Sequence, residues 1–385
     1  MSNLDISNFV TATEGQELTS PEVSPTVKLE PTFATNHPYD SDTIPRDILH
    51  YLPPSGAPFS LFGDPFAQQY YLMPDINVIR NCQYWLRGKM EDNNFTKHEI
   101  ALFTFLLRHR VATRQQIHKV IFDANTSEYK VKEFLRKCVK NGVLVSFKWV
   151  SPCKGERKVP HLYGLSPVAA KGAIDLLNRS VYLPRNYQFI PTQFVPGQAP
   201  SMTNYFSTVI ANEFYTKLYD LDRIIDWSNN ESYTLLNGFE FRPQYVIKTI
   251  KDANDFKYLW LEIIRPQQNW YNHTINRFRN IEAAITTLSR EVRPEIVVLL
   301  VDDVSRIPDI SALAEHFMPS VPIRFTTDER LIQKESDAIF YMYSDNGIVP
   351  ARITHLTADY PGMTASEYHA SFYDQAEDDD DDDNY

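Results

Sequence analysis

The stretch TKHEIALFTFLLRHR, Thr96–Arg110, decides how the first folded region of this chain is organised. Thr96 followed by Glu99 three residues later is the capping-box pattern that begins a helix, and apolar residues then recur at helical spacing. The next segments, ATRQQIHKVIF at 112–122 and TSEYKVKEFLRKCVKNG at 126–142, repeat this spacing. The sequence therefore predicts three successive helices.

The third predicted helix has start and stop signals of its own. Thr126 or Ser127 can cap its first turn, and Asn141-Gly142 is a typical helix end. Two strands are predicted after it, VLVSFKWV and PHLYGLS, joined by the basic turn SPCKGERKV. Three helices followed by a basic two-stranded hairpin predict a winged helix-turn-helix, which we place at residues 93–180.

Charge is distributed unevenly along the 385 residues. The net charge is −11, yet residues 97–172 hold 15 Lys and Arg against 5 Asp and Glu, a local balance of +10 that leaves −21 for the remainder. A basic island in an acidic chain is typical of a segment that binds nucleic acid.

The third predicted helix has an apolar face formed by Val131, Phe134, Leu135, Cys138 and Val139 and a mostly cationic opposite face. Such a helix can anchor one side in a core while the other enters a DNA major groove about 12 Å wide. The arginine of this face is the best candidate for reading a base edge, because a planar guanidinium pairs bidentately with guanine. The candidate DNA-binding residues are Arg114, Tyr129, Lys130, Arg136, Lys137 and Lys140 on the helices and Lys154, Arg157 and Lys158 at the hairpin tip.

Two alternatives stay open for this region. A cationic helix face can simply be solvated, and Glu133 near its centre would repel phosphate. A winged helix can also dock a protein, in which case binding would depend only weakly on salt.

The remaining segments differ in composition. Residues 49–92 are rich in aromatic residues and contain one amphipathic helix, which either packs on the next domain or docks a partner such as a replication or transfer protein. The acidic run Glu377–Asp383 either adds solubility or competes with DNA for the basic island. The sequence further predicts a disordered segment at 1–48, a proline-rich linker at 181–203 and a C-terminal segment at 346–385.

Cysteine content and hydropathy favour a cytoplasmic protein. Three widely spaced cysteines, Cys82, Cys138 and Cys153, predict neither a disulfide framework nor a zinc cluster. The longest apolar run, Ile296–Val301, is far shorter than the roughly 20 residues needed to span a membrane. We expect no membrane partner and no cofactor.

Residues 204–345 predict a second domain, an α/β fold with a mixed sheet, so that the whole chain is α+β and multi-domain. Helices are expected at residues 204–219, 272–291 and 310–318. Strands are expected at 223–227, within 239–250, and at 256–265, 295–303 and 322–327.

The stretch FRPQYVIKTIKDANDFKYLWLEIIRP, Phe241–Pro266, resembles the central hairpin of a restriction-endonuclease-type nuclease. Such enzymes hold a divalent metal with one acid on the first strand and a second acid, followed after one residue by lysine, on the next. Here these positions read Gln244, Glu262 and Ile264, so only one ligand remains. The pattern predicts a nuclease-like fold without a working site, in which Glu262 faces solvent or pairs with Arg265 or Lys257.

No other enzyme class is indicated. The chain has no phosphate-cradling glycine loop and no GxSxG motif, and its ten histidines are scattered. We therefore expect no catalytic and no metal-binding residues. The alternative of a different class is a nuclease with a non-standard site formed by Glu213, Glu262 and Asp226.

The segments HEIALFTFLLRHRVATRQQIHKVIF, LYGLSPVAAKGA and LWLEIIR together resemble the replication-relaxation family of bacterial plasmids, conjugative elements and phages. The resemblance covers roughly residues 96–330. It implies DNA handling at an origin of replication or transfer, or at a promoter. Similar members usually keep acidic residues where this chain has Gln244 and Ile264, and the departures argue against cleavage.

These observations together predict a non-enzymatic DNA-binding accessory or regulatory protein of a plasmid or phage, acting in replication, DNA transfer or transcription control. The alternatives are the nuclease with a non-standard site and a protein-interaction hub that uses the aromatic-rich extension.

Overall fold

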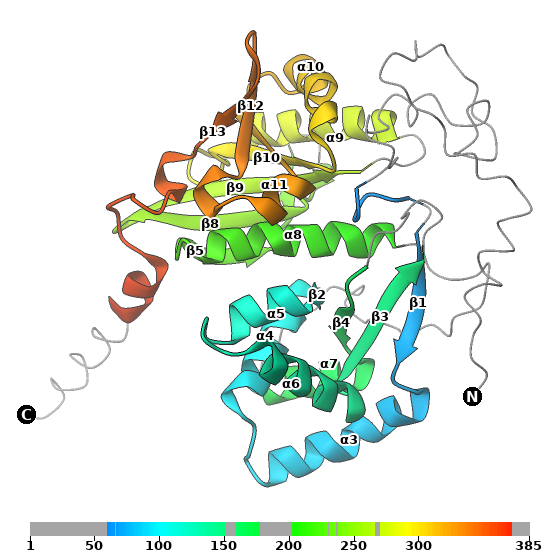
Figure 1. The fold of residues 1–385 in the computed structure, drawn as a ribbon. Helices are drawn as coiled ribbons and strands as arrows, with labels where there is room; N and C mark the ends of the chain where they lie inside the picture. The colour runs from blue at the N-terminus through cyan, green and yellow to red at the C-terminus, as the bar shows by residue number, and fades with distance from the viewer. Residues whose placement is uncertain are drawn as a thin grey trace, which may run out of the picture. The chain divides into compact units, whose positions relative to one another are not determined.

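The computed structural model describes residues 60–65, 67–150, 159–177, 202–229, 231–235, 238–265 and 270–371. Four of the expected features lie wholly or largely outside these residues: the disordered 1–48 segment, the tip of the basic hairpin, the 181–203 linker and the acidic tail. The chain divides into two compact units, with described residues 60–212 in unit 1 and 213–371 in unit 2. Both helices and strands are present in each unit, so the chain is a mixed α+β protein, as expected (Figure 1).

Unit 1 combines five helices and a four-stranded sheet in its described part. The sheet has the order β1-β3-β4-β2 and is antiparallel throughout. Its strands are β1 (Gln68–Met73), β2 (Val111–Thr113), β3 (Leu144–Val150) and β4 (Leu162–Leu165). The helices are α3 (Ile76–Glu91), α4 (Lys97–His109), α5 (Arg114–Ile121), α6 (Glu128–Lys140) and α7 (Pro167–Leu176).

Local sequence signals explain where these helices begin. Thr96 and Glu99 form the expected capping box at the start of α4. Thr113 and Gln116 form a second capping box that turns β2 directly into α5. Of the two candidate caps for α6, Ser127 is the one that accepts the backbone N–H, here from Lys130.

The helix expected in the aromatic-rich extension is α3, and it packs on the domain that follows, as predicted. Its buried side chains are Ile79, Cys82 and Leu86, whereas Tyr84 is exposed. A Cβ on Gly172 of α7 would lie 2.7 Å from a methyl carbon of Leu86. A larger residue at that glycine would therefore require the Leu86 side chain to move.

The first turns of α8 (Thr203–Tyr219) also belong to unit 1. The Asn212 amide donates to the carbonyls of His109 (3.1 Å) and Val111 (2.7 Å), and its oxygen accepts from Nδ1 of His109 at 2.8 Å. Burial lowers the pKa of His109 to about 3, so this imidazole is neutral at pH 7. The ring of Phe206 packs edge-on against that of Trp149. Residues 202–212 are thus part of the core of unit 1.

Unit 2 is built on a seven-stranded mixed sheet with the order β13-β12-β11-β10-β9-β8-β5. Neighbours β9, β10 and β11 are parallel, and the other pairs are antiparallel. The strands are β5 (Ile224–Ser228), β8 (Tyr245–Asp252), β9 (Asp255–Ile264), β10 (Ile296–Val301), β11 (Ile323–Thr327), β12 (Phe340–Ser344) and β13 (Gly347–Ala351), with a small separate pair β6 (Tyr233–Thr234) and β7 (Glu240–Phe241).

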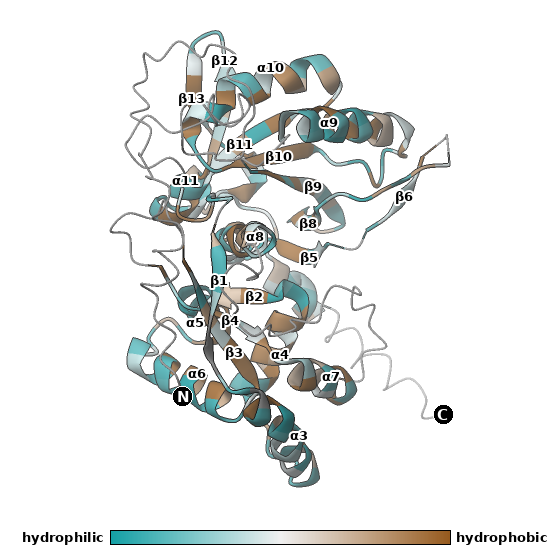
Figure 2. Ribbon diagram, turned by 90° about the vertical axis from the view of Figure 1, so that its right-hand side faces the viewer, coloured by the Kyte–Doolittle hydropathy of each residue, from teal (hydrophilic) through white to brown (hydrophobic). Residues whose placement is uncertain are grey.

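Helices cover both faces of this sheet. Figures 1 and 2 show α9 (Trp270–Thr287) and α10 (Ile307–Phe317) on one face and α8 on the other. Every residue of β10 is buried, because this strand lies in the interior of the sheet and is covered on both sides. The short helix α11 (Asp328–Gln333) follows β11 directly.

The order of elements expected for 204–327 is confirmed, but the expected domain end at residue 345 is wrong. That boundary falls in the turn between β12 and β13, two strands that pair with each other from Phe340↔Ala351 to Ser344↔Gly347. The sequence analysis also missed β1, which pairs with β3 from Gln68↔Val150 onward. Among the described residues, no helix is both long and apolar enough to cross a membrane.

Candidate nucleic-acid interface

The two faces of α6 are divided as the helical wheel predicts. Four of the five expected apolar residues, Val131, Leu135, Cys138 and Val139, are buried, and Phe134 is half-buried. Its ring packs edge-on against that of Phe122, at a centroid distance of 5.4 Å. The opposite face is exposed and carries Tyr129, Lys130, Lys132, Arg136, Lys137 and Lys140.

Two glutamates lie among these cations. Arg136 donates to Glu133 at 2.6 Å, one turn away on the same helix. Arg114, at the first position of α5, donates to Glu128 at the start of α6 over 3.2 Å. The structure therefore brings Arg114 next to the first turn of α6. Each of the two arginines has an acidic partner that was not predicted from the sequence.

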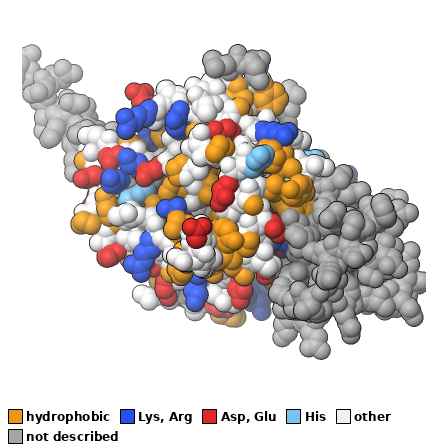
Figure 3. All heavy atoms as spheres, turned by 90° about the horizontal axis from the view of Figure 1, so that it is seen from above, with side chains coloured by type: hydrophobic (Ala, Val, Ile, Leu, Met, Phe, Trp, Pro, Cys, Tyr) orange, Lys and Arg blue, Asp and Glu red, His pale blue; other side chains and the backbone are white. Residues whose placement is uncertain are grey.

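The candidate residues of the hairpin tip, Lys154, Arg157 and Lys158, lie outside the described residues. The strands that lead to this tip are described, and they pair from Leu144↔Leu165 to Phe147↔Leu162. On the face of the molecule in Figure 3, by contrast, acidic, basic and apolar side chains of the described residues are interspersed. The exposed side of α6 is therefore mostly cationic, whereas the face of the molecule in Figure 3 is mixed in charge.

The nuclease-like position in unit 2 is closed by hydrogen bonds. The side chain of Gln244 accepts from the backbone N–H of Ile263 at 3.0 Å and donates to its carbonyl at 3.3 Å. The backbone N–H of Gln244 donates to the Glu262 carboxylate at 3.1 Å. The side-chain amide of Gln244 thus pairs with the backbone of β9 in the way that the backbone amide of a neighbouring strand would. Its role is structural.

Glu262 pairs with Arg277 of α9, and the expectation that it faces solvent or pairs with Arg265 or Lys257 is wrong. The side chain of Glu262 is 1% exposed, and its two oxygens accept from Nη2 and Nε of Arg277 at 2.7 and 2.8 Å. The guanidinium also lies 4.5 Å from the ring centroid of Phe241. A buried carboxylate needs a compensating cation, and here an arginine on the next helix supplies it.

The alternative metal site is not assembled. No group of three His, Cys, Asp or Glu side chains in the described part of the chain is arranged to hold a metal ion, so Glu213, Glu262 and Asp226 do not form one. Ile264, at the position of the nuclease lysine, is buried and apolar.

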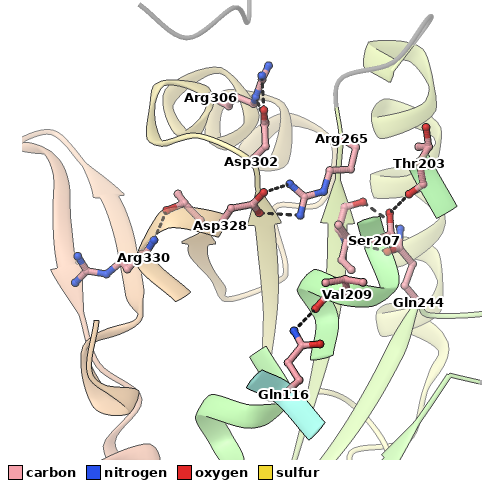
Figure 4. Close-up of polar contacts among 12 residues, drawn as sticks. Gln116, Thr203, Ser207, Val209, Gln244, Arg265, Asp302, Arg306, Asp328 and Arg330 are labelled. Carbon is pink, nitrogen blue, oxygen red and sulfur yellow. Dashed lines mark hydrogen bonds and ion pairs between the residues drawn. The ribbon is translucent and has the colours of Figure 1, made fainter. Parts of the chain in front are cut away.

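A row of charged residues that the sequence analysis missed follows the three parallel strands. Ile264, Val301 and Thr327 lie in register at the ends of β9, β10 and β11, and the next residue on each strand is charged. Arg265 donates to both carboxylate oxygens of Asp328 at 2.9 and 2.8 Å, and Asp302 pairs with Arg306 (Figure 4). Each of these four side chains is at most 4% exposed. The available signal was a charged residue directly after the last residue of each of the three strands.

Neither of the two described cysteines is poised for chemistry. Burial raises the pKa of Cys82 to about 12, and burial together with the nearby carboxylate of Glu99 raises that of Cys138 to about 12. Both thiols are therefore protonated at neutral pH, whereas nucleophilic attack or metal ligation requires a thiolate.

No protein-family model, curated protein or solved structure gives a significant match to this chain.

Proposed function

We propose that this chain is a non-enzymatic DNA-binding protein that acts as an accessory or regulatory factor of a plasmid or phage, in replication, DNA transfer or transcription control. The observation that carries the proposal is the exposed cationic face of α6, a helix whose other face is anchored in the core of unit 1. Its ligand is the major groove of double-stranded DNA.

The element order of unit 1 supports this proposal. α4, β2, α5, α6, β3 and β4 follow one another as the helices and strands of a winged helix-turn-helix do, with α6 in the place of the recognition helix. The sheet order β3-β4-β2 agrees with that arrangement. The link to mobile elements comes from the resemblance of the sequence to the replication-relaxation family.

The test is the salt dependence of binding by the full-length chain to a duplex of about 25 base pairs. If α6 and the basic hairpin tip make about five phosphate contacts, the slope of log affinity against log salt should be near −4 to −5, at about 0.9 for each contact. Fluorescence anisotropy between ~50 and ~300 mM salt measures the slope. A chain that binds no duplex at ~50 mM salt would refute the proposal.

Unit 2 is proposed to be a nuclease-like domain that has lost its site. The succession α8, β5, β8, β9, α9, β10 and the sheet order β5-β8-β9-β10 support a restriction-endonuclease-like core. In such a core the metal would lie between Gln244 and Glu262. A neutral amide, an arginine-paired carboxylate and a buried isoleucine occupy the positions that the chemistry needs.

We accordingly expect no hydrolysis of single- or double-stranded DNA with magnesium or manganese. Removing even one contact to a transition state of this kind typically lowers the rate by about 10² or more, and here a metal ligand and the lysine are both absent. A supercoiled plasmid nicking assay on the wild-type chain provides the measurement, with Glu262→Gln beside it. Metal-dependent nicking that disappears in Glu262→Gln would favour the nuclease alternative.

A further inference from the structure

The cations of the α6 surface fall into two groups by what they contact. The ammonium groups of Lys130, Lys132, Lys137 and Lys140 have no hydrogen-bond or ion-pair partner among the described residues. Arg136 and Arg114, in contrast, are each held by a glutamate, at 2.6 and 3.2 Å. The lysines can meet an anion with no carboxylate bonded to them, whereas each arginine keeps a carboxylate beside it while its remaining N–H donors are available to a ligand.

This difference affects phosphate and base contacts in opposite ways. An exposed ion pair is weak, but its glutamate stays beside any ligand that the arginine binds. When the ligand is a phosphate, that carboxylate repels it, so the arginine adds little to sequence-independent binding. When the ligand is a base edge, which carries no net charge, the repulsion is absent and the arginine fork is free to pair with guanine.

Arg136 and Glu133 match one base pair as a unit. In the major groove, a G·C pair presents the acceptors O6 and N7 of guanine next to the amino group of cytosine. The arginine offers donors, the glutamate offers an acceptor, and their nitrogen and oxygen lie 2.6 Å apart. A phosphate oxygen, which only accepts, can satisfy the arginine but not the glutamate.

We propose that Glu133 and Glu128 determine the specificity of the α6 surface, and that Arg136 with Glu133 reads a G·C pair. This inference rests on the proposed function. The lysines supply affinity for any duplex, and the two glutamates lower that affinity at sites where the arginines find no base partner. Like-charge contacts that oppose the wrong ligand are a common source of selectivity.

The test uses the full-length chain and two duplexes of equal length, one selected by the protein from a randomised pool and one of scrambled sequence. Glu133→Gln should bind the scrambled duplex several-fold more tightly at ~50 mM salt, because a charge that repels phosphate is gone. It should gain little on the selected duplex, where the acceptor for the cytosine amino group is weakened, so the ratio of the two affinities should fall by about threefold. Glu128→Gln should act in the same direction.

A matched control and a modified duplex complete the design. Glu91→Gln removes the acid of the exposed Arg87–Glu91 pair on α3, at 2.8 Å, and should leave both affinities unchanged. Replacing the guanine of the selected G·C pair by 7-deazaguanine removes N7 and should weaken the wild-type chain about tenfold and Arg136→Ala hardly at all.

Three results would overturn the inference while the proposed function stands. They are a selection that returns no preferred sequence, a Glu133→Gln variant that gains equally on both duplexes, and a wild-type chain insensitive to the 7-deazaguanine replacement. A wild-type chain that binds neither duplex would refute the proposed function itself, and the inference with it.

Discussion

Replacing Lys137 and Lys140 by glutamate is expected to lower the affinity of the full-length chain for duplex DNA on the order of 100-fold at ~100 mM salt. Each substitution removes one phosphate contact, and about 1.4 kcal/mol of binding free energy corresponds to a factor of ten. The slope of log affinity against log salt should flatten by about 2, because two fewer counterions are released. Both lysines are exposed on α6, so the fold should be unaffected.

The control for this variant changes the net charge by the same amount elsewhere. Arg290 and Lys334 are exposed residues of unit 2, and Arg290→Glu with Lys334→Glu also adds four negative charges. Its affinity and salt slope should stay close to those of the wild-type chain. Equal losses in the two double variants would mean that binding follows net charge and not the α6 surface.

Replacing Asp328 by alanine is expected to destabilise unit 2 by about 3–5 kcal/mol. The guanidinium of Arg265, whose side chain is 4% exposed, would lose both of its bonds to the carboxylate and remain buried without a compensating charge. Chemical denaturation followed by the fluorescence of Trp227, Trp260 and Trp270 of unit 2 gives the free energy of unfolding.

Two further variants separate the cost of an unpaired charge from the value of the pair. Arg265→Met combined with Asp328→Leu removes both charges and should recover most of the loss, because apolar residues of similar size can replace a buried pair. Glu91→Ala breaks an exposed pair and should leave the free energy of unfolding close to that of the wild-type chain. A double variant no more stable than Asp328→Ala would show that packing, and not charge, is the dominant effect.

The sequence predicted the elements that local signals encode. The two faces of α6 follow from the spacing of Val131, Leu135 and Cys138, and its first turn follows from Ser127. The strands of unit 2 follow from short apolar runs bounded by polar residues. One local signal was overlooked: Asp345-Asn346 followed by Gly347, which has a positive φ of 86°, is typical of a hairpin turn and joins β12 to β13 at the place where a domain end was expected.

Contacts between distant segments could not be predicted in the same way. Glu262 and Arg277 are separated by 15 residues and meet only because α9 crosses the sheet beside β9, and nothing near either residue specifies the other. The pairing of β1 with β3 joins residues about 80 positions apart. Such partners are fixed by packing of the whole unit, so a single sequence gives the charge of a site but not the identity of its neighbours.

The contribution of α8 to unit 1 has a consequence for synthesis on the ribosome. Every candidate DNA-binding residue has been synthesised once the ribosome has added Lys158. Two hydrogen bonds of unit 1 still require later residues: the side chain of Gln116 donates to the carbonyl of Val209 at 2.9 Å, and the N–H of Met202 donates to the carbonyl of Ala67 at 3.0 Å. At about 5–20 residues per second, the stretch from residue 181 to Asn212 takes about 2 to 6 s to make.

During that interval the nascent chain carries every candidate DNA-binding residue on a core that lacks its last helix. Phe206 has not yet covered Trp149, and Asn212 has not yet bonded to His109. A chain released early, before Met202, would therefore contain every candidate DNA contact and still expose apolar surface to chaperones and proteases. Completion of α8 thus sets when a newly made copy can hold the α6 surface on a finished core.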